Sequence, residues 1–340
     1  MKKCFLFAVL LPLFLLAGAN CTRQKPPSSL LTDKELAREF HIYSTEKLLH
    51  VWYPRIIDEM GGYFTNFSYD WTLLPEQNKM IVSQARGLWT ACKAAERFPD
   101  DPRYVEAAQH GFKFLRDHLW DQQYGRFYWL VSRTGEIRPN DPQHKKSYGI
   151  AFAIYGLAAY SRLTGSEEAL NLAREAFLWL EQHAHDSVFG GYYDWITREG
   201  ISFASPHYRR DLFPPDAVNV EWKDYNSSIH LLEAFAELYG VWKSPLLRQR
   251  LEQMLTIVRD SMTTAKGYLQ LYFTSDWSVV SFRHADRETF EHHLHFDHVT
   301  PGHDIETAYL LLEASHALGL ERDAETLRVA KRLVDHTLAT

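Results

Sequence analysis

Apolar residues recur at intervals of three and four through most of the chain, the spacing that places them on one face of an α-helix. This pattern predicts helices at 33–58, 79–97, 102–119, 144–163, 167–184, 223–240, 244–263, 303–318 and 322–337. Turn and start residues at Asp101-Pro102 and Gly165-Ser166 separate neighbouring helices. The pattern therefore predicts an all-α protein built from helical hairpins.

A short segment of glycine followed by aromatic residues recurs between the predicted helix pairs. It occurs at Gly61–Phe64, Gly125–Tyr128, Gly190–Tyr193 and Lys266–Leu269, with starts 64, 65 and 76 residues apart. Each interval accommodates two helices of about 20 residues with their connections. Repeated helix pairs must bury one face against their neighbours, which either a solenoid or a closed ring of hairpins achieves. We therefore expect one domain over residues 33–340, with a proline-containing loop at 201–220.

Residues 1–21 have the features of a targeting segment. Two lysines precede the apolar run Phe5–Leu16, which is shorter than a membrane-spanning helix. Cleavage after the small residues Ala17–Ala19 would make this a plain signal peptide, whereas a lipobox-like sequence before Cys21 would make that cysteine a lipidated N-terminus. We favour the lipoprotein, with 22–32 as a tether. Both interpretations place the protein outside the cytoplasm of a bacterium, in the periplasm or anchored to a membrane.

Composition excludes several classes of protein. With 340 residues, 46% of them hydrophobic and 14% aromatic, the chain is too apolar to be disordered and long enough for a large core. A net charge of −6 argues against a nucleic-acid partner. Of the three cysteines, Cys4 lies at the start of the leader, so only Cys21 and Cys92 remain. No disulfide framework is therefore expected. Ten tryptophans and 18 tyrosines suit stacking on sugar rings, although a Trp-rich helical core explains them equally well.

Two His-x-x-Glu pairs stand at predicted helix starts. His230 and Glu233 form the first, and His303 and Glu306 form the second. Residues three apart share a helix face, and a carboxylate beside an imidazole raises its pKa and fixes its tautomer, as general acid–base catalysis requires. The alternative role for each glutamate is to stabilise the first helical turn through the helix dipole. We take His230, Glu233 and His303 as candidate catalytic residues.

Other polar residues interrupt apolar helices. Arg86 and Trp89 share one helix, and a guanidinium there requires either a core carboxylate or a polar ligand. The segment Lys145–Phe152, which includes Tyr148, likewise places polar residues in an otherwise apolar helix. Asp276-Trp277 could place an indole under a sugar. Five histidines fall between residues 292 and 303, but they lack a cysteine partner and the His-Glu-x-x-His pattern of a helical zinc site. We therefore expect no metal site.

Taken in order, these motifs resemble the N-acylglucosamine 2-epimerase family, which includes cellobiose 2-epimerases and mannose isomerases. The resemblance covers about residues 33–320 and rests on the segments 79–86, 145–152, 190–192, 226–233, 276–277 and 302–306. It implies an (α/α)6 barrel, a toroid of helical hairpins. It also implies a cofactor-independent 1,2-proton shift at C2 of an aldose or reducing disaccharide, through a cis-enediolate.

The family's functional positions transfer to this chain through the same motifs. His230 and Glu233 match the catalytic His-x-x-Glu pair, Arg86 matches the arginine that holds the sugar oxygens near C1 and C2, and His303 lies in the matching Gly-His-Asp-Ile-Glu segment. The resemblance further implies substrate contacts at Asn226 and Trp277, and another active-site histidine at His183 or His185. We also take Tyr148, Trp89 and His183 as candidate substrate-binding residues.

The chain departs from the family pattern in three places. Ile150 stands where the family often has glutamine, and Ser228 stands where it often has histidine. The sequence ends at Thr340, whereas family members continue with another hairpin that carries a second catalytic histidine or a Trp-rich stretch. At about 65 residues per repeat we expect four to five repeats, an incomplete barrel at the C-terminal end.

Two other functions fit the same residues. One is a catalytically impaired glycan-binding lipoprotein. The other is a glycoside hydrolase on a similar helical barrel, which needs two opposed carboxylates, for which Glu233 and Asp276 are the available pair.

Overall fold

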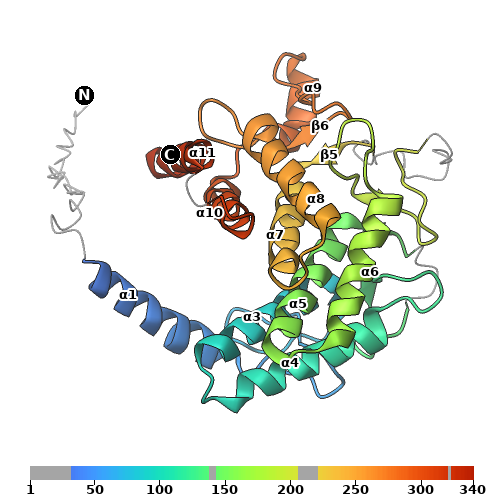
Figure 1. Ribbon diagram of the computed structural model, residues 1–340, viewed down its shortest axis with the longest axis vertical. Coiled ribbons are helices and arrows are strands. Elements are labelled where there is room, and N and C mark those ends of the chain that lie inside the picture. Colours follow the sequence, from blue (N-terminus) through green and yellow to red (C-terminus); the bar gives the residue numbers. More distant parts are fainter. Residues whose placement is uncertain (1–31, 138–142, 206–220, 321–322) are drawn as a thin grey trace, which may run out of the picture. The chain divides into compact units, whose positions relative to one another are not determined.

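The computed structural model describes residues 32–137, 143–205, 221–320 and 323–340 (Figure 1). The leader predicted at 1–21 and the tether up to residue 31 lie outside this range. The chain divides into two units, one ending at Leu48 and one beginning at Leu49. In the first unit, Thr32 caps helix α1 (Asp33–Ile42), and Glu35 completes the capping box. The π-helical turn η1 (Tyr43–Leu49) follows directly.

The second unit is helical, with short strands at the helix starts. Its helices are α2 (His50–Trp52), α3 (Ile81–Arg97), α4 (Pro102–Phe114), α5 (Ser147–Thr164), α6 (Glu167–His183), α7 (Tyr225–Val241), α8 (Pro245–Thr256), α9 (Arg287–His292), α10 (Pro301–Ala317) and α11 (Ala324–Ala339). The shorter turns are η2 (Leu115–Leu119), η4 (Ile257–Met262) and η5 (Leu294–Phe296). The strands are β1 (Lys79–Met80), β2 (Leu130–Val131), β3 (Lys145–Lys146), β4 (Trp195–Ile196), β5 (Lys223–Asp224) and β6 (Tyr272–Phe273).

The second unit repeats one module of strand, inner helix, outer helix and strand. In each of three modules the first strand pairs antiparallel with the last, β1 with β2, β3 with β4 and β5 with β6. The inner helices α3, α5, α7 and α10 pack side by side in that order (Figure 1). Each outer helix, α4, α6, α8 or α11, packs on the inner helix that precedes it. The predicted helical hairpins are therefore confirmed.

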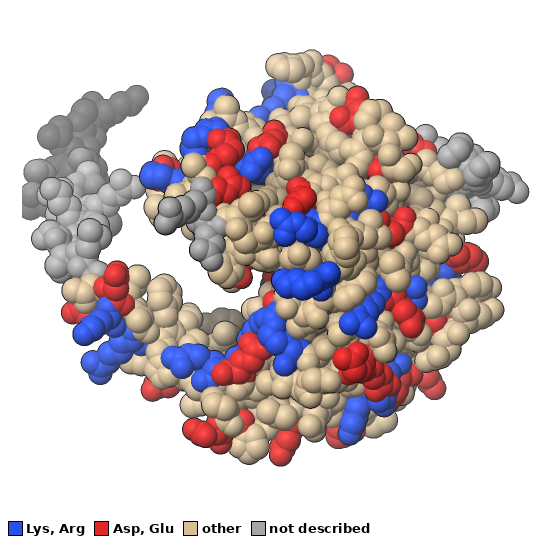
Figure 2. Space-filling view, viewed as in Figure 1, with Lys and Arg blue, Asp and Glu red and all other residues tan. Residues whose placement is uncertain are grey.

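The burial of each helix reflects its layer. Helix α5 lies between α3 and α7 and against α6, and it buries 14 residues around its circumference. The outer helix α6 buries only one stripe, from Ala169 to Leu180. Among the described residues, no helix has both the length and the apolar character needed to cross a membrane. Acidic and basic side chains are interspersed over the face shown in Figure 2, as on an ordinary solvated surface.

A buried lysine stands at the first position of β1, β3 and β5. Each side chain is fully buried and forms an ion pair with an aspartate from the preceding turn. The pairs are Lys79–Asp58 at 2.9 Å, Lys145–Asp121 at 3.3 Å and Lys223–Asp186 at 2.8 Å. Each ammonium also donates to the carbonyl oxygen of a turn glycine, at Gly61, Gly125 and Gly190 respectively. We call this arrangement the lysine clamp, because it ties the inner helices α3, α5 and α7 to the preceding glycine-aromatic turns.

The second cation of the clamp differs between modules. Arg133 donates to Asp58 at 2.9 Å and Arg198 donates to Asp121 at 2.8 Å. In the third module Ser275 occupies the corresponding turn, and its carbonyl oxygen accepts from the lysine at 2.6 Å. Although burial raises the pKa of these aspartates, the neighbouring cations and backbone amides outweigh it and lower the pKa.

Candidate active site

His230 is the best-oriented acid–base group of the inner helices. It lies in the second turn of α7, is 3% exposed, and its Nδ1 is 2.8 Å from Oε2 of Glu233. Its ring packs on Phe152 and Tyr148 of α5, with centroid distances of 4.6 and 5.5 Å. Because Nδ1 faces the carboxylate, Nε2 is the nitrogen left for a reacting group.

Helix α10 brings a second histidine and a second carboxylate to the same place. One side-chain ligand atom from each of His230, His303 and Glu306 lies within 4.8 Å of the others. Nδ1 of His303 is 3.3 Å from the hydroxyl of Tyr225. Partial burial lowers the pKa of His303, while the negative charge of Glu306 acts in the opposite direction. Two imidazoles and two carboxylates thus converge between α7 and α10.

Arg86 supplies a positive charge from α3. Its guanidinium carbon lies 4.9 Å from the ring centroid of Phe152, and within the described ranges no carboxylate forms an ion pair with it. The side chain is exposed and helps to line a cavity of about 620 Å³. The aromatic residues of this cavity are Trp52, Tyr63, Phe64, Phe67, Tyr69 and Trp71. Of the two roles open to this arginine, the structure favours the polar ligand over the core ion pair.

Two polar atoms near this cluster are buried without a hydrogen-bond partner among the described residues. They are Oδ1 of Asn226 and Nε1 of Trp89. Burial raises the pKa of Tyr148, whereas its hydrogen bond to Asn226 lowers it. Trp89 stacks on Tyr155 with a centroid distance of 4.8 Å. Because buried polar atoms are nearly always satisfied in native proteins, each of these two atoms is available to a polar ligand.

Comparisons with known proteins agree with this geometry. The sequence profile of the N-acylglucosamine 2-epimerase (GlcNAc 2-epimerase) family matches residues 62–340. The chain is 33% identical to a cellobiose 2-epimerase of Bacteroides fragilis over 293 residues, which are 84% of this chain and 67% of that protein. The chain belongs to the N-acylglucosamine 2-epimerase family. The predicted family is therefore confirmed.

Other relatives confirm the fold class. The structure of a cellobiose 2-epimerase from Spirochaeta thermophila superimposes with a TM-score of 0.74 at 29% identity, covering 90% of this chain and 70% of that one. A D-mannose isomerase of Marinomonas mediterranea is 25% identical over 285 residues, 82% of this chain and 64% of that protein. The chain thus has the (α/α)6-barrel type of fold, and it spans about two thirds of the length of these relatives.

Two residues that the family resemblance assigned to substrate have structural contacts elsewhere. Nε1 of Trp277 donates to the carbonyl oxygen of Phe189 at 3.1 Å. Nδ1 of His183 is 2.7 Å from the carbonyl oxygen of Gly200. None of their contacts joins them to the cluster around His230, so their roles in binding substrate stay predictions.

The other histidine and acidic candidates also lie in turns and loops. Nε2 of His185 is 3.2 Å from Oε1 of Gln253. Asp276 sits in an exposed turn, where its carboxylate accepts from Thr274 and Ser278. These hydrogen bonds hold Asp276 within its own turn, whereas Glu233 contacts His230.

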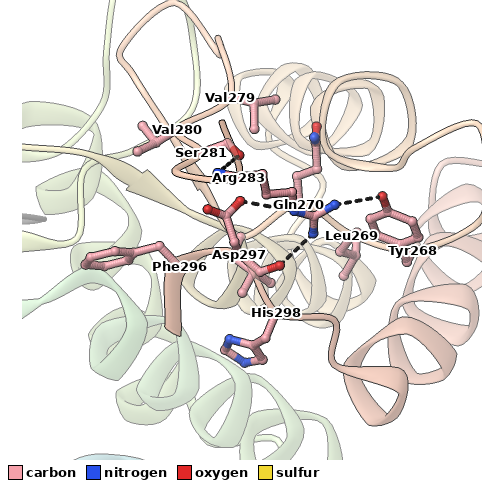
Figure 3. Close-up of a pocket in the computed structure, with 11 residues that line it drawn as sticks. Tyr268, Leu269, Gln270, Val279, Val280, Ser281, Arg283, Phe296, Asp297 and His298 are labelled. Atoms are coloured by element: carbon pink, nitrogen blue, oxygen red, sulfur yellow. Dashed lines mark hydrogen bonds and ion pairs between the residues drawn. The ribbon is translucent and has the colours of Figure 1, made fainter. Parts of the chain in front are cut away.

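The His-rich stretch between α9 and α10 packs against its own aromatic residues. His293 stacks on Phe282 at 4.2 Å between ring centroids. A second cavity beside this stretch has a volume of about 50 Å³ (Figure 3). Arg283 crosses it and donates to the carbonyl oxygen of Asp297 at 2.6 Å, while the ring of His298 points away from it. This cavity is far smaller than the several hundred Å³ of a typical ligand site.

Sequence reasoning omitted three residues from the candidate site: Glu306, Phe152 and Tyr155. The first two contact the cluster directly, and burial together with the nearby Glu233 raises the pKa of Tyr155. The spacing from the buried lysines could have identified two of these residues, Phe152 and Tyr155. Phe152 and Tyr155 stand seven and ten residues after Lys145, the same intervals that separate His230 and Glu233 from the lysine of β5.

Proposed function

We propose that this chain is a sugar 2-epimerase or aldose–ketose isomerase that moves a proton at C2 of a reducing aldose or disaccharide without a cofactor. One observation carries the proposal: a buried imidazole, His230, is oriented by Glu233 and faces a second imidazole on α10. The names of its relatives, cellobiose 2-epimerase and D-mannose isomerase, support the substrate class.

The proton shift follows from these positions. Nε2 of His230 takes the C2 proton of the open-chain aldose, and the electrons of the C–H bond form the C1–C2 double bond of a cis-enediolate. Arg86 donates to the sugar oxygens at C1 and C2, where negative charge develops. Glu233 holds the tautomer of His230 and stabilises its protonated form.

The second imidazole decides the product. If His303 returns a proton to C2 from the opposite face, the sugar is epimerised. If His230 returns its own proton to C1, the product is the ketose. Glu306 stands beside both rings and can stabilise either protonated imidazole.

Solvent exchange tests this proposal. In D2O, the native chain should incorporate deuterium at C2 of cellobiose, mannose or glucose, as followed by NMR. His230→Ala should abolish exchange, and Glu233→Gln should lower its rate by about 10²–10⁴-fold, the usual range for acid–base groups. His110→Gln is the matched control, because His110 is a partly buried histidine that contacts the carbonyl oxygen of Asp58. Absence of exchange with all three sugars, while the Bacteroides fragilis relative exchanges normally, would refute the proposal.

The aromatic cavity beside Arg86 favours a second candidate, a glycan-binding protein without turnover. Its volume of about 620 Å³ falls in the range of small-molecule sites, and its Trp and Tyr walls suit sugar rings. Oligosaccharide binding that survives His230→Ala, together with no turnover by the native chain, would support this candidate over the enzyme.

We also propose that the chain is an exported lipoprotein anchored through Cys21, from its lipobox-like leader. Metabolic labelling with a radioactive fatty acid should mark the native protein and not the Cys21→Ala variant. If neither the native protein nor the variant is labelled, the lipid anchor is refuted, and the leader would then serve plain secretion.

A further inference from the structure

Two nitrogen ligands and one oxygen ligand converge between α7 and α10. The ligand atoms of His230, His303 and Glu306 lie within 4.8 Å of one another. Around Zn²⁺, bonds of about 2.0–2.2 Å place ligand atoms about 3.3 Å apart. Side-chain rotations that move each ligand atom by about 1 Å would therefore bring the three atoms to bonding distance of one ion. The residues stand on two helices packed against each other, which limits how far they separate.

Glu233 contacts the ring nitrogen of His230 that faces away from these three ligand atoms. Metal-binding histidines usually give their other ring nitrogen to a carboxylate, which fixes the tautomer and strengthens the ligand. Here Oε2 of Glu233 is 2.8 Å from Nδ1 of His230, which presents the Nε2 lone pair to the site. Among the described residues, the two carboxylates and the cation Arg86 give the site a net charge of about −1, which favours a dication.

We propose that His230, His303 and Glu306 bind a divalent transition-metal ion, for which Zn²⁺ is the best match, and that the bound ion inhibits the sugar reaction. Two histidines and one glutamate leave a fourth position open to water. The inhibition rests on the proposed function, because the Nε2 lone pair that binds the ion is the one that takes the C2 proton. The binding itself does not depend on that function.

Calorimetric titration of the full chain with ZnCl₂, in the absence of sugar, tests the binding. We expect one site per chain and a rise in melting temperature with Zn²⁺. His303→Ala and Glu306→Gln should weaken binding at least about tenfold, and Glu233→Gln should weaken it by about 10–100-fold, as is usual for residues behind a ligand. Circular dichroism of each variant establishes that it is folded.

The exposed histidines outside the site supply the matched control. His292→Ala/His295→Ala removes two imidazoles from the His-rich stretch and should leave Zn²⁺ affinity unchanged. Unchanged affinity in His303→Ala and Glu306→Gln, or loss of binding only in the double control, would overturn the site.

Activity measurements test the inhibition separately. In the deuterium-exchange assay, Zn²⁺ should lower the rate competitively with sugar, and EDTA should restore it. Zn²⁺ that leaves the rate unchanged or raises it overturns the inhibitory role. If no sugar is turned over at all, the proposed function fails, and the calorimetric titration still decides whether the metal site exists.

Discussion

Replacing Asp121 with asparagine removes the counter-ion of a fully buried lysine. Lys145 is 3.3 Å from this carboxylate, and both side chains have no exposed area. The amide of asparagine retains an oxygen for the backbone amides of Gln123 and Tyr124, so the turn itself keeps its hydrogen bonds. The substitution therefore removes the charge that faces Lys145, and it also removes the oxygen that accepts from Nε of Arg198.

The expected loss of unfolding free energy depends on the ammonium of Lys145, which the substitution leaves buried without its carboxylate. Breaking a buried ion pair by removing one partner costs about 3–5 kcal/mol. The lysine can instead release its proton, which from a folded pKa of about 8 costs about 1.4 kcal/mol at pH 7. The lost hydrogen bond between Arg198 and the carboxylate adds about 1.5–3 kcal/mol. Burial already lowers the pKa of Lys145 to about 8 in the native chain. We expect Asp121→Asn to lose about 3–4 kcal/mol of unfolding free energy at pH 7.

The same substitution gives a signature in pH. In the variant, the pKa of Lys145 falls below 7, so the folded lysine is neutral while the unfolded lysine still holds its proton. The unfolded state then binds one proton more, and stability rises by about 1.4 kcal/mol for each pH unit. In the native chain this rise begins only near pH 8, where folded Lys145 starts to lose its proton. The gap between native chain and variant should therefore narrow between pH 7 and pH 8.

Urea unfolding, followed by tryptophan fluorescence and circular dichroism at pH 7.0, 7.5 and 8.0, measures both effects. Asp117→Asn is the matched control, because Asp117 pairs with Arg116 at the surface and should cost less than about 1 kcal/mol. If Asp121→Asn does not fold, Asp121→Asn/Lys145→Met still decides, since it also removes the charge of the lysine and should recover the part of the stability lost through Lys145. A loss under about 1 kcal/mol, or a gap that does not change with pH, would refute the reasoning.

Three further predictions concern helix packing and the candidate site. Gly156→Ala should cost about 1–3 kcal/mol in urea unfolding, because the new Cβ would lie 2.8 Å from the carbonyl oxygen of Ala85; no loss would contradict the close approach of α3 and α5. Arg86→Lys should lower kcat/KM about tenfold, since an ammonium cannot present two coplanar donors to the sugar; unchanged kcat/KM would remove Arg86 from catalysis. His183→Ala should lower the melting temperature through its lost contact with Gly200 and keep kcat within about twofold; a larger fall in kcat would place His183 at the site.

The helices were predictable because their apolar spacing extends over many residues. The structure places α5 at Ser147–Thr164 where the pattern predicts 144–163, and α7 at Tyr225–Val241 where it predicts 223–240. The short strands of the described residues were not predictable, since a strand of two residues has no measurable period. They are defined by pairing with strands on the far side of a helical hairpin.

Only those contacts of the candidate site that lie within one helix were predictable from the sequence. The contact of His230 with Glu233 follows from their spacing along one helix. The approach of Glu306 to His230 depends on how α10 packs on α7, and spacing within α10 carries no information about that. In the same way, Lys145 could be predicted to need a partner, but a position in the preceding turn can be named only when the fold is known.

The buried lysines set a common register for three inner helices. The residue seven positions after each lysine is Arg86, Phe152 or His230. These side chains meet in that order: Arg86 lies 4.9 Å from the ring of Phe152, and that ring lies 4.6 Å from His230. Equal distance from the clamp therefore places a cation, an aromatic ring and a base at one level of adjacent helices.

Helix α10 keeps this register although it has no lysine. Asp304 accepts a hydrogen bond from the backbone of its glycine-aromatic turn at 2.8 Å, as Gln84 does in α3. Glu306 follows Asp304 by two residues, as Arg86 follows Gln84, so the fourth helix adds its carboxylate beside His230 at the same level. A slip of one residue in any of these helices would turn its side chain by about 100°. Fixing the start of each helix thus fixes which four side chains meet, and the repeat can hold its fold while that one position carries different chemistry.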